Sequence, residues 1–172
     1  YFSSTKKAAP EAATRAAEKF GLDIDNYLAF FRTLHSYAFN QLGMTKEKML
    51  GPDDYKEFGE KCGIPIKVAK FSDSDGTFNS DNEYLTIINT AAVKRMDLLE
   101  YYDSRQNMLD IERNTLYLLA EELNKFKKEK GLRDFKDLLE AFILKDSINT
   151  FEVLFIDEAQ DMYLLQWEMV RK

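Results

Sequence analysis

The length, composition and charge of the chain exclude several classes of protein. Its 172 residues, 45% of them hydrophobic, are enough to bury one substantial core and a small second lobe, which excludes a disordered protein. The formal net charge of −6 argues against a protein that mainly coats a polyanion, because neutralising phosphates requires clustered Lys and Arg. Cys62 and His35 are the only cysteine and histidine, so neither an internal disulfide nor a Cys/His metal cage can form.

Neither the hydropathy nor the first residues indicate a membrane or export signal. No run of 18 apolar residues is present, and residues 1–4 lack the basic-then-apolar layout of a signal peptide. A single cysteine suits a reducing compartment, so we expect cytoplasmic residence and no membrane partner. Because Tyr1 is not an initiator Met, we expect a chain cut from something longer.

The N-terminal third predicts helices that end at glycines. Residues 8–20 have apolar side chains at helical spacing and stop at Gly21, where glycine can adopt the left-handed conformation that ends helices. A second helix is expected over residues 25–42, ending in the same way at Gly43. A proline followed by two acids predicts a short helix over residues 52–62, since proline fits the first turn and carboxylates complement its positive end.

The middle of the chain alternates between a polar segment and further helices. Residues 71–82 are rich in Ser, Asp, Gly and Asn, which predicts an exposed loop. Residues 86–94 are compatible with either a strand or a helix. Residues 98–130 contain a long amphipathic helical stretch, and Gly131 separates it from a further helix over residues 134–144.

The most informative element is an apolar run followed by acids. Residues 153–156 are rich in strand-forming side chains and predict a central parallel strand that is buried on both faces. The run ends in Asp157 and Glu158, and ligands of open parallel sheets bind beyond the carboxyl ends of the strands. This is the layout of a Walker B motif, in which the Asp holds Mg²⁺ and the Glu polarises the attacking water. An acidic helix start, favoured by the helix dipole alone, explains the same few residues.

Four segments, in one order along the chain, resemble motifs of the UvrD/Rep-type superfamily 1 helicases. The acidic segment resembles motif II, which is an apolar run, an Asp-Glu-x-Gln-Asp string and a Gln in the next helix. The other three resemble motif Ia, a Thr-x-His-Ser element and the stretch that precedes motif II. The segments are TKKAAPE at residues 5–11, TLHSYA at 33–38, DFKDLL at 134–139, and FEVLFIDEAQD at 151–161 with Gln166.

The resemblance implies a fold and an activity. The implied fold is α/β and mostly helical: a truncated RecA-like P-loop NTPase domain over residues 1–43 and 131–172, with a helical subdomain inserted over residues 44–130. The full-length protein is expected to be an ATP-dependent DNA helicase that translocates 3′ to 5′. Its cofactors would be Mg²⁺ and ATP, and its partner DNA with a single strand and a duplex junction.

Roles for individual residues also follow from the resemblance. The basic tail at residues 125–133, which includes Lys127 and Lys128, and the loop at residues 71–82 are candidates for contact with duplex DNA. The sequence contains no Walker A string, so we expect this chain alone not to hydrolyse ATP. The expected site residues are Glu158 for catalysis, Asp157 for Mg²⁺, Gln160 near the nucleotide, and Thr5, Lys7, Thr33 and His35 for DNA.

Two other readings remain open at this point. The same motifs occur in helicase-like subunits of nuclease or repair complexes. Alternatively, the chain is a helical interaction module whose Walker B-like string arose by chance. By themselves, residues 3–5 suit an ordinary helix cap, and a lone histidine such as His35 more often lies buried with its hydrogen bonds satisfied.

Overall fold

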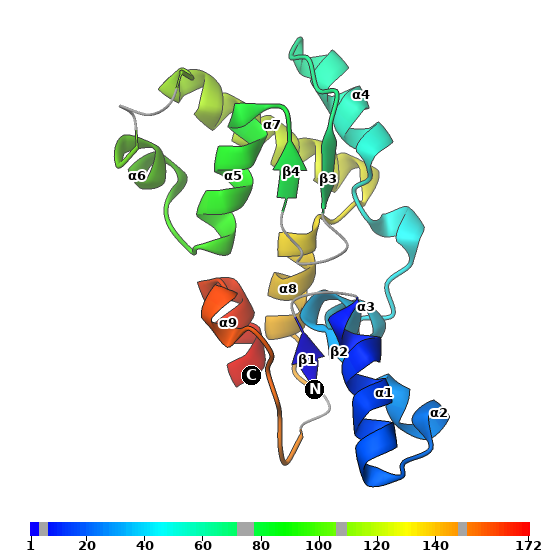
Figure 1. Ribbon diagram of the computed structural model, residues 1–172. Coiled ribbons are helices and arrows are strands. Elements are labelled where there is room, and N and C mark those ends of the chain that lie inside the picture. The colour runs from blue at the N-terminus through cyan, green and yellow to red at the C-terminus, as the bar shows by residue number, and fades with distance from the viewer. Residues whose placement is uncertain (4–6, 72–77, 106–109, 148–150) are drawn as a thin grey trace.

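The computed structural model describes residues 1–3, 7–71, 78–105, 110–147 and 151–172, arranged as two lobes (Figure 1). The first, here called the sheet lobe, contains both ends of the chain, and the second, here called the helical lobe, contains its middle. The sheet lobe comprises β1 (Phe2–Ser3), α1 (Ala8–Phe20), α2 (Ile24–Tyr27), η1 (Leu28–Phe30), β2 (Arg32–Thr33), α3 (Leu34–Gln41), α8 (Phe135–Ile143), η4 (Ala159–Asp161) and α9 (Leu164–Arg171). The helical lobe comprises α4 (Pro52–Cys62), β3 (Ala69–Phe71), β4 (Phe78–Ser80), α5 (Glu83–Val93), α6 (Leu98–Asp103) and α7 (Arg113–Lys130), with η2 (Lys46–Lys48) leading into it.

Three parallel segments form the small sheet of the sheet lobe. Strand β1 pairs in parallel with β2, and Ile156 forms a parallel bridge to Phe2. The backbone N–H of Asp157 donates to the carbonyl of Phe2 at 2.8 Å. Because all three segments run in the same direction, Ser3, Thr33 and Asp157 lie together at the carboxyl ends of the segments.

The prediction of a fully buried central strand over residues 153–156 is wrong. Only Ile156 bridges to a neighbour, and the side chains of Val153 and Phe155 are each 67% exposed. Within the described residues, no further strand pairs with this segment. The segment therefore forms the edge of the sheet, with one side of its backbone unpaired.

Local capping signals determine the ends of two predicted helices. Helix α1 ends where expected, with Gly21 in the left-handed conformation and its N–H donating to the carbonyl of Ala17. Helix α4 also has the predicted bounds, since Pro52 occupies its first turn and the Asp54 carboxylate accepts a 2.9 Å hydrogen bond from the N–H of Gly51. Glycine and proline signals were sufficient for these two elements.

The continuous helix predicted over residues 25–42 is wrong, because a strand interrupts it. Residues 32–33 pair with β1, and the chain then turns into α3. The hydroxyl of Thr33 accepts a hydrogen bond from the N–H of Ser36 at 3.2 Å and so caps α3. The break therefore places Thr33 at the end of the sheet and at the start of a helix.

The helical lobe differs from its prediction in one segment. The expected loop over residues 71–82 includes an antiparallel hairpin of β3 and β4, with residues 72–77 lying outside the described part. The stretch over residues 98–130 contains the expected long helix, α7, with the short helix α6 before it. Residues 86–93 of the ambiguous segment belong to helix α5, and Lys94 caps its end. The fold is thus mostly helical with two small sheets among the described residues.

Each lobe has its own hydrophobic core. In the sheet lobe, α3, α8 and α9 pack around β1, and Phe2, Leu138 and Leu165 are buried there. In the helical lobe, two adjoining clusters form between α4, α5, α6 and α7, around Phe58 and Leu116. In the described part of the chain, no helix combines the length and apolar character needed to cross a membrane.

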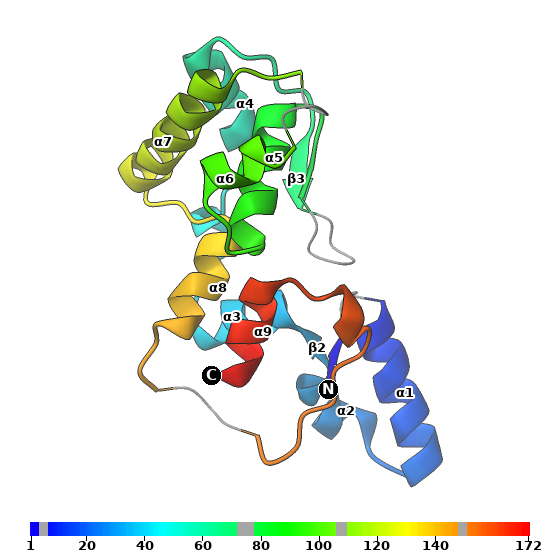
Figure 2. The ribbon, with the colours of Figure 1, turned by 90° about the vertical axis from the view of Figure 1, so that its left-hand side faces the viewer.

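The chain crosses between the lobes twice, and the two crossings are paired. The N–H of Leu50 donates to the carbonyl of Arg133 at 2.8 Å, and the N–H of Arg133 donates to the carbonyl of Lys48 at 2.9 Å. Helix α8 begins directly after the second crossing and lies beneath the helical lobe (Figure 2). The division at residues 44 and 130 into a RecA-like part and an inserted subdomain stays a prediction.

Candidate functional site

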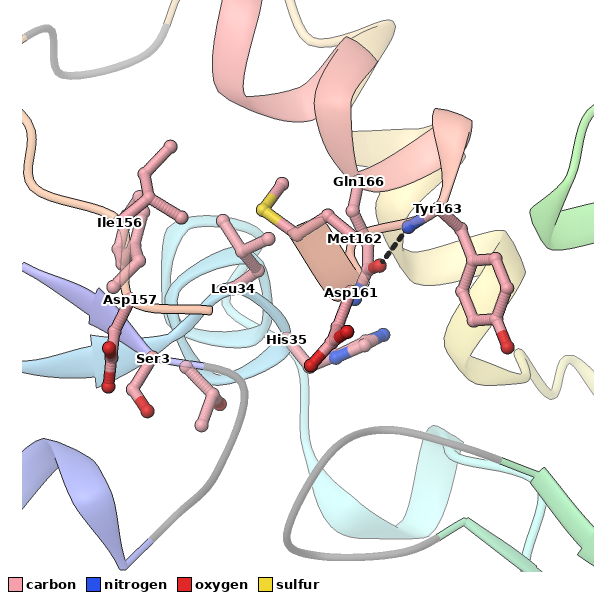
Figure 3. Close-up of a pocket in the computed structure, with 11 residues that line it drawn as sticks. Ser3, Leu34, His35, Ile156, Asp157, Asp161, Met162, Tyr163 and Gln166 are labelled. Atoms are coloured by element: carbon pink, nitrogen blue, oxygen red, sulfur yellow. Dashed lines mark hydrogen bonds between the residues drawn. The ribbon is translucent and has the colours of Figure 1, made fainter. Parts of the chain in front are cut away.

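A cavity of about 320 Å³ lies at the carboxyl ends of the parallel segments (Figure 3). Its floor comes from the sheet and the start of α3, and its other wall comes from the turn that follows the acidic residues and from the start of α9. The lining residues are Phe2, Ser3, Thr33, Leu34, His35, Ile156, Asp157, Asp161, Met162, Tyr163 and Gln166. Cavities at this edge of a parallel sheet are the usual ligand sites of such folds.

Asp157 is held by Tyr1, the residue directly before β1. The phenol of Tyr1 donates a hydrogen bond of 2.7 Å to Oδ2 of Asp157. Burial, the hydrogen bond to Asp157 and the negative charge of that carboxylate raise the pKa of Tyr1 to about 12. Tyr1 therefore stays protonated at neutral pH and orients the carboxylate as a neutral donor.

Glu158 has an unusual backbone and does not line the cavity. Its φ of 54° lies in the left-handed region, which is costly for a residue with a β-carbon. Its side chain is exposed, and its carboxylate accepts a hydrogen bond from the amide of Gln160. The two adjacent acids therefore point to different surroundings, Asp157 into the cavity edge and Glu158 toward solvent and Gln160.

Thr33 and His35 bring the Thr-x-His element to the same cavity. Thr33 is buried and also lines an open hollow of about 510 Å³ beside α1 and η1, together with Arg32 and Ser36. The His35 ring meets Phe135 edge-on, with 5.1 Å between the ring centroids. Burial lowers the pKa of His35 to about 4, so the ring is neutral at pH 7 and offers hydrogen bonds without charge.

The structure thus brings together three of the predicted site residues and separates others. Thr33, His35 and Asp157 line one cavity, whereas Glu158 and Gln160 lie on the exposed turn beside it. Lys7 is exposed just before α1 and does not line the cavity, and Thr5 lies outside the described residues.

Sequence reasoning named two residues of the cavity, Ser3 and Asp161, only as parts of longer segments, and it did not single out Tyr163. Ser3 lines it from the end of β1, and Asp161 and Tyr163 line it from the turn before α9. Gln166, a part of the motif II match, accepts a 2.8 Å hydrogen bond from the N–H of Tyr163 and so caps α9 (Figure 3). The position of Ser3 at a strand end was the available signal.

The carboxylates at the cavity suit a metal ion that shares its coordination with a substrate. Nowhere in the described residues do three His, Cys, Asp or Glu side chains gather to hold a metal by themselves. Asp157 and Asp161 are the two carboxylates that line the cavity. One or two carboxylates completed by phosphate oxygens and water is the usual environment of Mg²⁺ bound with a nucleotide. The residues present therefore fit a nucleotide-borne Mg²⁺ better than a protein-only site.

The prediction that Lys127 contacts duplex DNA is wrong. Its side chain is 7% exposed, and Nζ donates to the carboxylates of Asp134 and Asp137 at 2.7 Å each. Elsewhere in the tail, Lys130 is paired with Glu57, whereas Lys128 is exposed. Of the basic residues at 125–133, Lys127 is therefore withdrawn into the interior and Lys130 is paired at the surface.

The comparisons with known proteins identify one family. A family model described as the UvrD/REP helicase N-terminal domain matches residues 1–172. The match includes the helical lobe as well as the segments with recognisable motifs. No curated protein and no solved structure matches the chain.

Proposed function

The chain belongs to the UvrD/REP helicase N-terminal domain family, and from this we propose that it is the part of an ATP-dependent DNA helicase that carries Walker B and contacts for single-stranded DNA. The observation that carries the proposal is the cavity of about 320 Å³ at the carboxyl ends of three parallel segments. Ser3, Thr33 and Asp157 meet there, each from a different segment. The phosphate end of ATP would occupy this cavity.

Asp157 would hold the Mg²⁺ that accompanies the nucleotide. The ion would neutralise charge on the phosphates, with phosphate oxygens and water completing its coordination. Glu158 would orient and polarise the attacking water, and the amide of Gln160 already holds its carboxylate. Since the sequence contains no Walker A string, we propose that this chain alone does not hydrolyse ATP.

Single-stranded DNA would run along the hollow on the other side of Thr33. This hollow includes Arg32 and Ser36 and adjoins the N-terminal end of α1, which follows Lys7. Backbone N–H groups at a helix start, hydroxyls and lysines are common donors to DNA phosphates. We propose contacts from Thr5, Lys7 and Thr33 along this hollow, and from His35 on the cavity side of Thr33. Thr33 lines both hollows and would link the DNA path to the nucleotide cavity.

The helical lobe would then be the subdomain inserted into the first RecA-like domain. We propose boundaries at residues 44 and 130, with residues 1–43 and 131–172 forming the RecA-like part. The two paired crossings of the chain and the separate cores support this division. In this arrangement the helical lobe faces the duplex at the junction.

The proposal is tested by ATP hydrolysis in the full-length protein. Glu158→Gln removes the carboxylate that polarises water, and we expect single-stranded-DNA-stimulated hydrolysis to fall on the order of a hundredfold or more, as for loss of a general base. Binding of single-stranded DNA should be unchanged. Glu152→Gln is the matched control, because Glu152 is an exposed acid on the same segment. Wild-type hydrolysis by Glu158→Gln would contradict the proposal.

A further inference from the structure

Arg95 connects the helical lobe to two helices of the sheet lobe. It follows the last turn of α5, and its guanidinium donates to Oε1 of Glu140 on α8 at 2.8 Å. Nε and Nη2 both donate to Oε2 of Glu168 on α9, at 2.9 and 2.7 Å. One side chain therefore joins three helices, one from the helical lobe and two from the sheet lobe.

The backbone of Arg95 suits glycine better than arginine. Its φ is 57°, and its N–H donates to the carbonyl of Ala92 at 3.1 Å, as at a left-handed helix end. The described helices α1, α3, α4 and α7 leave through the same conformation at glycines, where it has no steric cost: Gly21, Gly43, Gly63 and Gly131. At α5 an arginine occupies the position, and what it adds is the double ion pair.

Helix α9 leads from Arg95 to the proposed nucleotide cavity. This helix begins directly after the acidic turn, and Tyr163 and Gln166 at its start line the cavity. Glu168, the partner of Arg95, lies within the same short helix. If a nucleotide at the cavity displaces α9, it therefore also displaces Glu168, the partner of Arg95.

Resting on the proposed function, we infer that Arg95 is a positioning residue that couples the nucleotide cavity to the helical lobe. It acts through α9. Because the guanidinium of Arg95 is bound to Glu168, the helical lobe moves with this helix when a nucleotide enters or leaves the cavity. The side chains of Arg95, Glu140 and Glu168 are 32%, 32% and 35% exposed, so solvent does not fully screen the pairs. The coupling would act on DNA at the junction between single strand and duplex, which the helical lobe would face.

The chain provides a matched control for this inference. Arg113 forms a similar two-bonded pair with Asp103, at 3.0 and 3.1 Å, but both residues lie within the helical lobe. Loss of that pair removes a similar arginine–carboxylate ion pair without changing the contact between the two lobes. Any effect that is specific to Arg95 therefore comes from losing the contact between the lobes.

The test measures base pairs unwound per ATP hydrolysed in the full-length protein. Arg95→Gly removes the side chain and suits the left-handed backbone, so we expect the melting temperature to stay within a few degrees of wild type. Hydrolysis stimulated by single-stranded DNA and the Kd for that DNA should stay within about twofold, while base pairs unwound per ATP fall at least about fivefold, a coupling of ordinary size. Glu168→Gln should give the same loss without altering the backbone, and combining both changes should add little further loss. Arg113→Gln should unwind like wild type.

The outcomes separate this inference from the proposed function. Wild-type unwinding per ATP in Arg95→Gly, or an equal loss in Arg113→Gln, would overturn the coupling role while leaving the helicase proposal intact. A parallel fall in unwinding and in melting temperature would assign Arg95 a merely structural role and overturn the inference as well. A wild-type protein without DNA-stimulated hydrolysis would overturn the proposed function, and the inference with it.

Discussion

Two acidic pairs of the sheet lobe have opposite surroundings. Asp134 and Asp137, at the start of α8, both accept hydrogen bonds from the buried ammonium of Lys127. Asp157 and Glu158, at the sheet edge, accept from a phenol and an amide, and neither forms an ion pair within the described residues. A neutralising cation, more than the acids themselves, therefore separates a structural acidic cluster from one that is free to bind a cation.

Removing the cation of the buried cluster should destabilise the protein more than any other change proposed. Lys127→Met leaves two carboxylates in a poorly solvated place without their cation, and removing one partner of a buried ion pair costs about 3–5 kcal/mol. We therefore expect the free energy of unfolding, measured by urea denaturation, to fall by about that amount. Lys125→Met is the control, since Lys125 is exposed and 3.9 Å from Glu122, and it should cost less than about 0.5 kcal/mol. Equal stability of the two variants would remove the distinction between the two acidic pairs.

A smaller effect concerns the pH dependence of the same cluster. Burial raises the pKa of Asp137, but the charge of Lys127 and its hydrogen bond outweigh burial and hold that pKa below its usual range. A carboxyl whose pKa is lowered in the folded state stabilises the folded protein at pH values above its unfolded pKa of about 3.9. This stabilisation disappears as the pH falls through the folded-state pKa. Asp137→Asn should therefore be less stable than wild type at pH 7, with a gap that narrows below about pH 4. Urea denaturation at several pH values measures the gap, and a constant gap would contradict the role of the ion pair.

The helix ends were the most predictable part of the fold, because their signals are local. Gly21 and Pro52 determine their own backbone conformations, and the helices at these positions have the predicted bounds. Strand β2 has only two residues, and its pairing partner β1 lies thirty positions away in the sequence, so no local sequence pattern predicts this strand. Short strands of this kind are determined by tertiary pairing.

The candidate site was predictable in its residue types and less so in its geometry. The apolar run with Asp157 indicated a ligand at the sheet edge, and the cavity lies there. The left-handed backbone of Glu158 and the hydrogen bond from Tyr1 depend on the neighbouring segments, which sequence spacing does not encode. The burial of Lys127 was hidden for the same reason, since Asp134 approaches it only after the chain turns at Gly131.

If Asp157 lies at the site of a nucleotide-borne Mg²⁺, as we propose, then the nucleotide affinity of the full-length protein should depend on this side chain only when Mg²⁺ is present. The Kd of ATP is measured with Mg²⁺ and with EDTA, for wild type and for Asp157→Asn. We expect the substitution to weaken binding of Mg²⁺-ATP by about tenfold or more, as for loss of a contact worth about 1.4 kcal/mol, and to leave binding in EDTA nearly unchanged. Equal affinities of both proteins for Mg²⁺-ATP, or an equal loss in EDTA, would contradict the account.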